Sequence, residues 1–156
     1  MKLVDLFCGC GGMSLGFQKA GFDVTAAYDK WEPAVKIYRA NFTHPIFEYD
    51  LNNDGVIDEI GSSHPDIIIG GPPCQDFSIA GLRNLGERAN LTIRYAEIVT
   101  KVKPKWFVME NVYNIVKMPI LPKAIEIFKM SELLSMTKIP FLLSRFIAQY
   151  EAITAA

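Results

Sequence analysis

The sequence has few of the residues that bind metals or form disulfides. Among its 156 residues are three cysteines and two histidines. Cys8, Cys10 and Cys74 are odd in number and lack the spacing of a disulfide framework, so we expect reduced thiols in a cytoplasmic protein. Cys8 and Cys10 could begin a metal site, but no further cysteine or suitably placed histidine completes a ligand set. We therefore predict no metal.

An excess of basic charge is also missing. The formal net charge is −1, which argues against nucleic-acid binding by bulk charge but leaves room for a local basic patch. No apolar run is long enough to span a bilayer, and the chain opens on a strand-like segment, so we expect neither membrane contact nor a signal peptide. The absence of Gly-Lys-Ser/Thr excludes the phosphate-binding loop of NTPases. Half of the residues are hydrophobic, as in one globular domain with a core.

Short apolar segments rich in strand-forming residues alternate with helical patterns. In residues 29–42 the apolar side chains recur at helical spacing on one face, and residues 89–102 repeat this pattern. The alternation predicts an α/β fold with a parallel sheet, in which ligands bind beyond the carboxyl ends of the strands. The predicted strands are residues 2–7, 23–29, 45–50, 66–71 and 106–111.

The segment DLFCGCGG, residues 5–12, ends the first predicted strand and opens a helix. Glycines at such a turn let backbone amides approach a ligand at the positive end of the helix. Asp29 ends the next strand about 20 residues later, the usual offset of a carboxylate that binds ribose hydroxyls. These residues favour a nucleoside site. The alternative is a tight turn followed by a solvated aspartate.

The segment GGPPCQDFS, residues 70–78, puts a cysteine on a stiff turn after the fourth predicted strand. Pro72 and Pro73 fix the backbone and remove two amide donors, which suits a loop that must present Cys74 accurately. A thiolate is a strong nucleophile, and this one follows a strand at the edge where ligands bind. We interpret Cys74 as a nucleophile, and the alternative is a buried, inert thiol.

DLFCGCGG, GGPPCQDFS and MENV (residues 109–112) have the order and spacing of motifs in the cytosine-C5 DNA methyltransferases, which the chain resembles from residue 1 to about residue 129. The resemblance implies a Rossmann-like S-adenosylmethionine-dependent methyltransferase fold, here incomplete, and a role in a restriction-modification system. Lys30 stands where family members often have an aromatic residue or another side chain against the adenine, and Trp31 is one place further on. The resemblance places these residues at the cofactor: Phe7, Gly9, Gly11, Gly12, Asp29 on the ribose, Lys30, Asp50 on the adenine amino group, Leu51, Pro72 and Leu91.

The resemblance also implies the chemistry. Cys74 adds to C6 of cytosine, which makes C5 nucleophilic enough to take the methyl group. Glu110, in its protonated form, hydrogen-bonds N3 of the same ring. The target base must leave the DNA duplex to reach such a pocket. The resemblance places these residues at the catalytic site: Pro73, Cys74, Gln75, Ser78, Glu110, Asn111 and Val112.

Residues 130–156 match none of the family's later elements, which are an arginine-containing motif, a target-recognition domain and a final segment beside the cofactor. The spacing of Leu143, Phe146, Ile147 and Tyr150 predicts a helix in this tail. We interpret the chain as truncated or frame-shifted, or as one subunit of a split enzyme whose complementary subunit brings the half that recognises double-stranded DNA. Two alternatives keep the fold: a transfer-RNA cytosine-C5 methyltransferase, and an inactive remnant that only holds cofactor.

Overall fold

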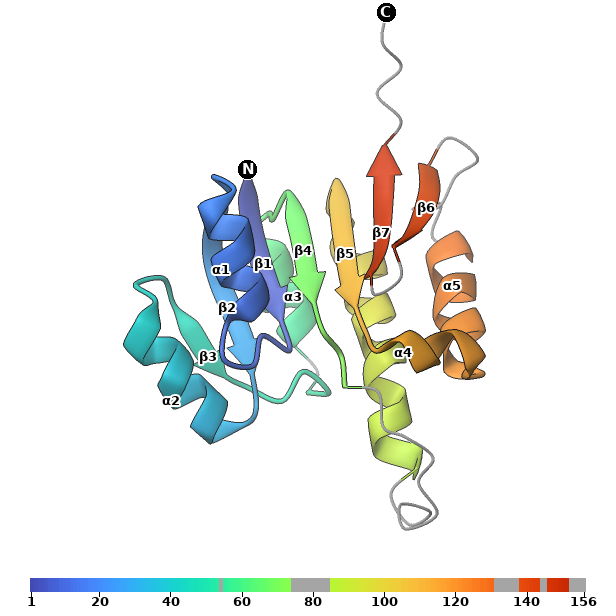
Figure 1. Cartoon of the computed structure of the whole chain (residues 1–156), viewed down its shortest axis with the longest axis horizontal. Coiled ribbons are helices and arrows are strands. Elements are labelled where there is room, and N and C mark those ends of the chain that lie inside the picture. Colours follow the sequence, from blue (N-terminus) through green and yellow to red (C-terminus); the bar gives the residue numbers. More distant parts are fainter. Residues whose placement is uncertain (54, 74–84, 131–137, 144–145, 152–156) are drawn as a thin grey trace, which may run out of the picture.

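The computed structural model describes residues 1–53, 55–73, 85–130, 138–143 and 146–151. Its strands form one seven-stranded sheet in the order β3-β2-β1-β4-β5-β7-β6 (Figure 1). β1 to β5 are parallel, and β7 and β6 continue the sheet as an antiparallel pair beside β5. The elements are β1 (Lys2–Leu6), α1 (Gly12–Lys19), β2 (Asp23–Asp29), α2 (Glu32–Asn41), β3 (Ile46–Glu48), α3 (Val56–Ser62), β4 (Ile67–Gly70), α4 (Leu85–Val102), β5 (Trp106–Glu110), the 3-10 helix η1 (Tyr113–Lys117), α5 (Ile120–Met130), β6 (Lys138–Leu143) and β7 (Phe146–Glu151).

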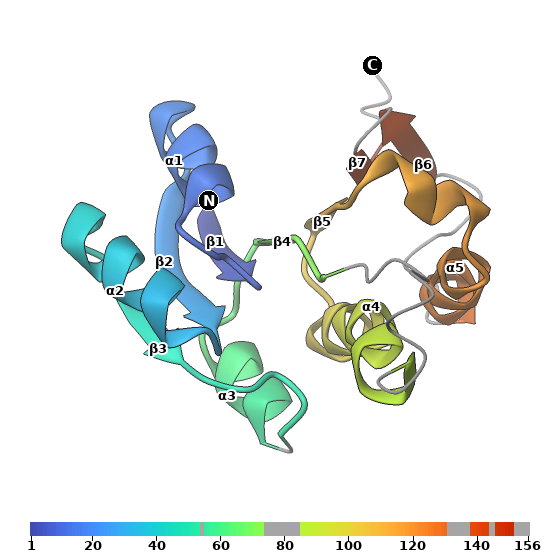
Figure 2. The same ribbon diagram turned by 60° about the horizontal axis from the view of Figure 1, so that its bottom comes forward.

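Helices cover both faces of the parallel strands. α1 and α2 lie on one face, and α3, α4 and α5 lie on the other (Figure 2). The side chains of β1 alternate between the two layers, as a strand with a period of two requires. Leu3 packs in a cluster with Met13 and Phe17 of α1, whereas Val4 and Leu6 belong to the cluster formed with α3, α4 and α5. The predicted α/β architecture is therefore confirmed.

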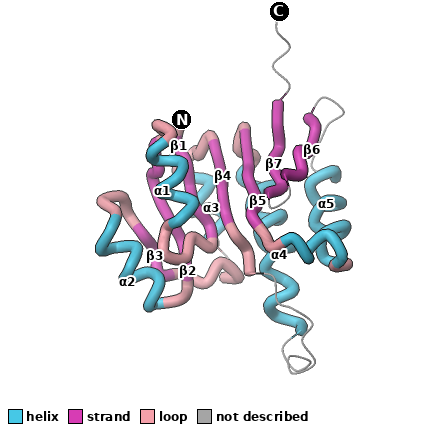
Figure 3. Tube along the Cα trace, viewed as in Figure 1, coloured by secondary structure: helices cyan, strands magenta, loops and turns pink. Residues whose placement is uncertain are grey.

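The helices follow the predicted apolar patterns. Pro33 stands in the first turn of α2, where a missing N–H costs no hydrogen bond. Tyr38 of α2 and Tyr95 of α4 are fully buried on the predicted faces. No helix in the part of the chain that the structure describes is long and apolar enough to cross a membrane. The loops that follow β1, β2 and β4 reach the same edge of the sheet, which positions the site (Figure 3).

The tail differs from the sequence-based expectation. The helix predicted from Leu143, Phe146, Ile147 and Tyr150 is wrong, because the structure has strands β6 and β7 there. β7 pairs with β5 through Val108 to Glu110, which would otherwise form an open edge of the sheet. Backbone pairing with that edge outweighs a local helical pattern, since strand preference depends strongly on context. The division of the chain at residue 129 stays a prediction.

Candidate active site

A pocket of about 570 Å³ lies at the carboxyl ends of the parallel strands. Its walls come from the residues after β1, the end of β2, the loop after β3, the loop after β4 and one helix, α4. This is the edge at which parallel sheets bind their ligands. Of the predicted site residues, Phe7, Asp29, Lys30, Asp50, Leu51, Pro73 and Leu91 line the pocket.

Three further lining residues were not assigned from the sequence: Trp31, Tyr49 and Gly71. Trp31 is 63% exposed, so its ring offers a large apolar surface that the protein itself leaves uncovered. It directly follows Lys30, the position at which the sequence resemblance implies a side chain against the adenine. The sequence shows only that an aromatic residue stands one position after Lys30. That this residue lines the pocket and is largely exposed is visible only in the structure.

The glycine turn after β1 has the backbone that its sequence predicts. Gly9 and Gly11 have φ values of 53° and 92°, in the left-handed region that favours glycine. A Cβ on Gly11 would overlap the rings of Phe42 and Tyr38, whereas nothing lies within 4 Å of a Cβ built on Gly9. Gly11 is thus required by packing, and the space beside Gly9 is open to a ligand.

Asp29 connects the glycine turn to the start of α2. One carboxylate oxygen accepts a hydrogen bond of 2.8 Å from the backbone N–H of Gly9, and the other accepts one of 2.8 Å from the N–H of Trp31. Carboxylate oxygens each have a second lone pair, so these bonds leave acceptor capacity for hydroxyl donors.

The three glycines that were predicted to contact the cofactor lie outside the pocket lining. Gly9 and Gly11 belong to the turn after β1, and Gly12 begins α1 as an exposed residue.

Asp50 is held at the rim of the pocket by two donors. The backbone N–H of Asn52 lies 3.0 Å from one carboxylate oxygen and Nζ of Lys30 lies 3.3 Å from the other. Partial burial opposes ionisation of Asp50, but the bonds from Asn52 and Lys30 outweigh it and lower the pKa of this carboxyl. Asp50 is therefore an ionised acceptor at neutral pH, which suits the recognition of an amino group.

A second cluster joins the ends of β4 and β5. The side-chain amide of Asn111 donates a hydrogen bond of 2.8 Å to the carbonyl oxygen of Pro72, and both lie in a buried setting. A Cβ on Gly71 would lie 3.2 Å from Oε2 of Glu110, so this carboxyl group sits directly against the loop after β4. Val112 is 53% exposed and donates its N–H to Oδ1 of Asn111. Of the other predicted catalytic residues, Cys74, Gln75 and Ser78 lie outside the described residues.

Asp5 is fully buried beneath α1, a feature not assigned from the sequence. Ser14 Oγ donates to Oδ2 of Asp5 over 2.6 Å, and the Tyr38 hydroxyl donates to Ser14 Oγ over 2.6 Å. Nε2 of His44 lies 2.6 Å from the same hydroxyl. Oδ1 of Asp5 has no hydrogen-bond partner among the described residues. Burial, opposed in part by the bond from Ser14, raises the pKa of Asp5 to about 7.

Cys8 packs against this region as a structural thiol. It is 8% exposed, and burial raises the pKa of its thiol, which the nearby Asp5 and Asp29 carboxylates raise further. A thiol held protonated in this way is a poor nucleophile and a poor metal ligand. In the described ranges, no three His, Cys, Asp or Glu side chains are grouped so that they could hold a metal ion.

Comparison with known proteins identifies the family. The model of the C-5 cytosine-specific DNA methylases matches residues 1–131. The chain is 54% identical over 130 residues to the Type II methyltransferase M.HindV of Haemophilus influenzae, covering 82% of this chain and 43% of that protein. It is 57% identical over 114 residues to the Type II methyltransferase M.HgiDI of Herpetosiphon aurantiacus, covering 72% and 37%. The chain thus spans less than half the length of these two relatives.

A solved structure extends the likeness to the tail. A protein encoded within an Escherichia coli prophage superposes with a TM-score of 0.75 at 27% identity, and the match covers 97% of this chain and 47% of the other. Because so little of this chain is left out, the superposition reaches into the β6–β7 hairpin. The fold, the matched family model and two relatives above 50% identity agree. The chain therefore belongs to the family of C-5 cytosine-specific DNA methylases.

Proposed function

We propose that this chain supplies the cofactor pocket and the nucleophile of a DNA (cytosine-5-)-methyltransferase of the Type II restriction-modification kind. One observation supports this most directly. The same pocket is lined by Asp29 and Asp50 and by Pro73, which immediately precedes Cys74 in the sequence. Methyl transfer requires the cofactor and the activated base to lie next to each other. Pro73 connects the loop of the nucleophile to the lining of the pocket, so a cofactor in the pocket would lie beside that loop.

The residues present fit S-adenosylmethionine as the cofactor. Asp29 lines the pocket and retains acceptor capacity for ribose hydroxyls. Gly9, which donates to Asp29, is outside the lining but has open space beside its backbone. Asp50 is an ionised acceptor for an amino group, and the uncovered ring of Trp31 offers a surface on which a purine can stack. When bound, the cofactor supplies an electrophilic methyl group.

The chain's own residues act on the cytosine ring. Sγ of Cys74 would form a bond to C6, and the electron pair of the C5–C6 double bond would become available at C5 for a bond to the methyl group, whose bond to the cofactor's sulfur would break with its electron pair left on sulfur. Glu110 holds a proton at N3 and stabilises the charge that develops there. A base then removes the proton from C5, the C5–C6 double bond reforms, and Cys74 leaves as a thiolate. Asn111 keeps the loop that begins at Pro72 beside Glu110.

The proposed substrate is double-stranded DNA in the cytoplasm, from which the target cytosine is flipped. Two relatives named as Type II methyltransferases are more than 50% identical to this chain, which favours DNA over transfer RNA. With a formal net charge of −1, the chain has few spare cations for phosphates. We propose that these cations, and the contacts that choose the sequence, come from a recognition half in the same enzyme or in a complementary subunit.

A chimera tests this function. Residues 1–130 of this chain would replace the matching segment of the Haemophilus influenzae relative, so that the site residues come from this chain and the rest from an enzyme of known length. The probe is a duplex in which every cytosine is 5-fluorocytosine. Fluorine replaces the C5 hydrogen, so no base can remove a proton from C5 and the Cys–C6 bond stays trapped. We expect a cofactor-dependent covalent adduct on a denaturing gel.

Two control variants distinguish the loss of the nucleophile from a general effect of replacing a cysteine. Cys74→Ser should abolish the adduct, and Cys10→Ser, a change at an exposed cysteine outside the pocket lining, should leave it unchanged. An adduct that survives Cys74→Ser contradicts the assignment of the nucleophile. A folded chimera without any adduct contradicts the proposed function of these residues. We expect no adduct from the isolated chain, because a misplacement of about 1 Å can cost about a hundredfold in rate.

A further inference from the structure

The turn at residues 50–53 follows β3 and forms the wall of the pocket that carries Asp50 and Leu51. Within the turn, the N–H of Asn53 donates to the carbonyl oxygen of Asp50 over 2.9 Å, and the N–H of Asn52 donates to its carboxylate over 3.0 Å. These local bonds shape the turn, but they do not fix its position relative to the rest of the pocket. That position has to come from contacts with another element.

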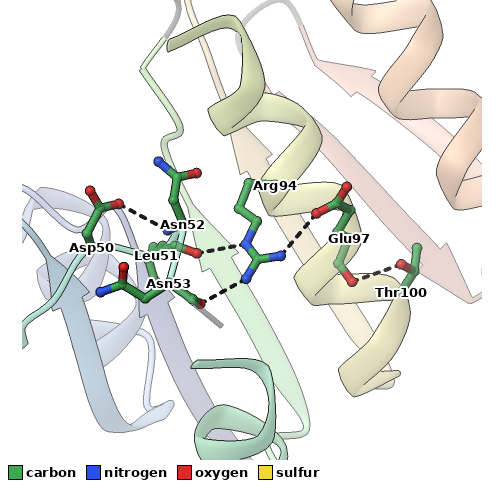
Figure 4. A network of polar contacts seen from close by, with 7 residues as sticks. All are labelled: Asp50, Leu51, Asn52, Asn53, Arg94, Glu97 and Thr100. Carbon is green, nitrogen blue, oxygen red and sulfur yellow. Dashed lines mark hydrogen bonds and ion pairs between the residues drawn. The ribbon is translucent and has the colours of Figure 1, made fainter. Parts of the chain in front are cut away.

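Arg94 of α4 makes those contacts (Figure 4). Its Nε donates to the carbonyl oxygen of Leu51 over 2.7 Å, and Nη2 donates to the carbonyl oxygen of Asn53 over 3.0 Å. Nη1 lies 3.1 Å from Oε2 of Glu97 on the same helix. The Arg94 side chain is only 15% exposed, so the guanidinium is enclosed between α4 and the turn.

Leu51 is 2% exposed and packs in the core cluster that also contains Tyr95 and Ala96 of α4. Of the two side chains that bind this wall through polar contacts, Arg94 is the stronger anchor. The other anchor, the ion pair of Lys30 with Asp50, joins side chains that are 54% and 39% exposed, and pairs of that kind contribute little. Arg94 instead makes charge-assisted bonds from a rigid planar fork to two carbonyls of one turn; the bond to Leu51 is partly buried and the bond to Asn53 is exposed. Lysine could not reproduce both bonds, because an ammonium is a point donor on a flexible stem.

The same helix also forms another wall. Leu91 lies one turn before Arg94 on α4 and lines the pocket. Resting on the proposed cofactor function, we propose that Arg94 is a positioning residue for the adenine end of the cofactor. It holds the turn at residues 50–53 against α4, so that Asp50 and Leu51 face Leu91 across a gap of fixed width. No sequence motif marks it, since its acceptors are backbone carbonyls 43 and 41 residues away.

The first arm of the test needs no cofactor. Amide hydrogen exchange is measured residue by residue on the whole chain, for wild type, Arg94→Lys and the control Arg39→Lys, an exposed arginine of α2 outside the pocket lining. We expect the amides of Asn52 and Asn53 to exchange at least about tenfold faster in Arg94→Lys alone, as loss of charge-assisted bonds implies. The amides of β1 should be unchanged. Equal exchange at Asn52 and Asn53 in wild type and Arg94→Lys overturns the proposal.

The second arm measures the adenine end itself. S-adenosylhomocysteine is titrated in parallel with its hypoxanthine analogue, in which an oxygen replaces the adenine amino group that Asp50 is expected to bind. We expect Arg94→Lys to weaken the adenine compound about tenfold and to bring the ratio of the two affinities close to one. Arg39→Lys should retain both values. A lowered melting temperature with the wild-type ratio intact would mean a structural role only, and overturns the proposal.

Two further outcomes are decisive. If Arg94→Lys does not fold, Glu97→Gln replaces it, because it removes only the partner that orients the guanidinium. A change of about threefold in the same direction is then expected, and none overturns the proposal. If the wild-type chain binds neither compound, the proposed function fails and the adenine role fails with it. If wild type binds S-adenosylhomocysteine and Arg94→Lys binds both compounds as well as wild type does, only the positioning role of Arg94 is rejected.

Discussion

Asn111 and Pro72 are joined by a hydrogen bond of 2.8 Å, donated by the side-chain amide of Asn111 to the carbonyl oxygen of Pro72. Asn111 is 5% exposed, so the bond is shielded from water. It ties the end of β5 to the loop after β4. The loop that leads to Cys74 therefore starts from a fixed place beside Glu110, and its residue Pro73 lines the proposed cofactor pocket.

Replacing Asn111 with alanine should destabilise the protein by about 1–3 kcal/mol, because the carbonyl of Pro72 loses its donor in a buried place. Urea unfolding measures the change. The matched control is Asn114→Ala in η1, where the asparagine is exposed and the expected change is within about 0.5 kcal/mol. Equal stability of the two variants would contradict a structural role for the Asn111–Pro72 bond.

Asp5 should make the stability of the chain depend on pH. Its pKa is raised from 3.8 to about 7 in the folded state, so between these values the folded chain keeps a proton that the unfolded chain loses. The stabilisation from Asp5 is fully present below about pH 3.8 and is lost as the pH rises through about 7. Asp5→Asn removes this dependence.

Urea unfolding at pH 5 and pH 8 tests this titration. The stability difference between Asp5→Asn and wild type should shift in favour of the variant by about 2 kcal/mol between these pH values. Asn114→Ala, at an exposed and uncharged residue of η1, serves as the control, and its stability difference from wild type should be the same at both pH values. A difference that does not change with pH would mean that Asp5 is already ionised in the folded chain at pH 5.

Alanine substitutions at Gly11 and Gly21 distinguish the cost of backbone strain from the cost of overpacking. Both have positive φ, 92° and 88°, but only at Gly11 would a Cβ meet other side chains, those of Phe42 and Tyr38. We expect Gly21→Ala to cost about 1 kcal/mol for its conformation alone. Gly11→Ala should cost at least about 1–3 kcal/mol more, the usual cost of overpacking. Thermal melting compares them, and equal melting temperatures would refute the packing role of Gly11.

Trp31 should matter for binding and not for folding. The residue is 63% exposed and lines the pocket, so truncation to alanine removes surface available to a ligand and little that packs within the chain. We expect Trp31→Ala to weaken binding of S-adenosylhomocysteine by roughly tenfold, as lost aromatic contact implies. The melting temperature without ligand should not change. Ile37→Ala, at an exposed residue of α2, should leave both quantities as in wild type.

Sequence alone predicted the parallel sheet because strand composition and helical spacing are local signals. It failed in the tail, where the pattern around Phe146 and Ile147 fits a helix but the open edge of β5 takes the segment as strand β7. The third predicted strand, residues 45–50, proved shorter, Ile46–Glu48, because Asp50 is engaged in the turn that follows. Such outcomes depend on partners far along the chain, which local patterns do not contain.

For the site, sequence could name residues that are expected to contact a ligand, but not the residues that hold them in place. Asp29 ends β2 and Asp50 lies in the turn after β3, and both are at the carboxyl edge of the sheet, where parallel sheets bind ligands. Arg94 looks like any polar residue of a helix, since its partners are backbone atoms of a distant turn. The burial of Asp5 follows from the alternation along β1, which puts it on the same face as Leu3, beneath α1.

Calorimetric titration of S-adenosylhomocysteine into the chain tests the central claim most directly, namely that these residues form the cofactor pocket of a methyltransferase. Wild type should bind at one site. Asp29→Ala, which removes the carboxylate between the glycine turn and α2, should weaken binding at least about tenfold, as loss of bonds to a charged acceptor implies. Asp23→Ala, at the opposite end of β2, should bind as wild type does. No binding by the folded wild-type chain, or equal binding by wild type and Asp29→Ala, would contradict the claim.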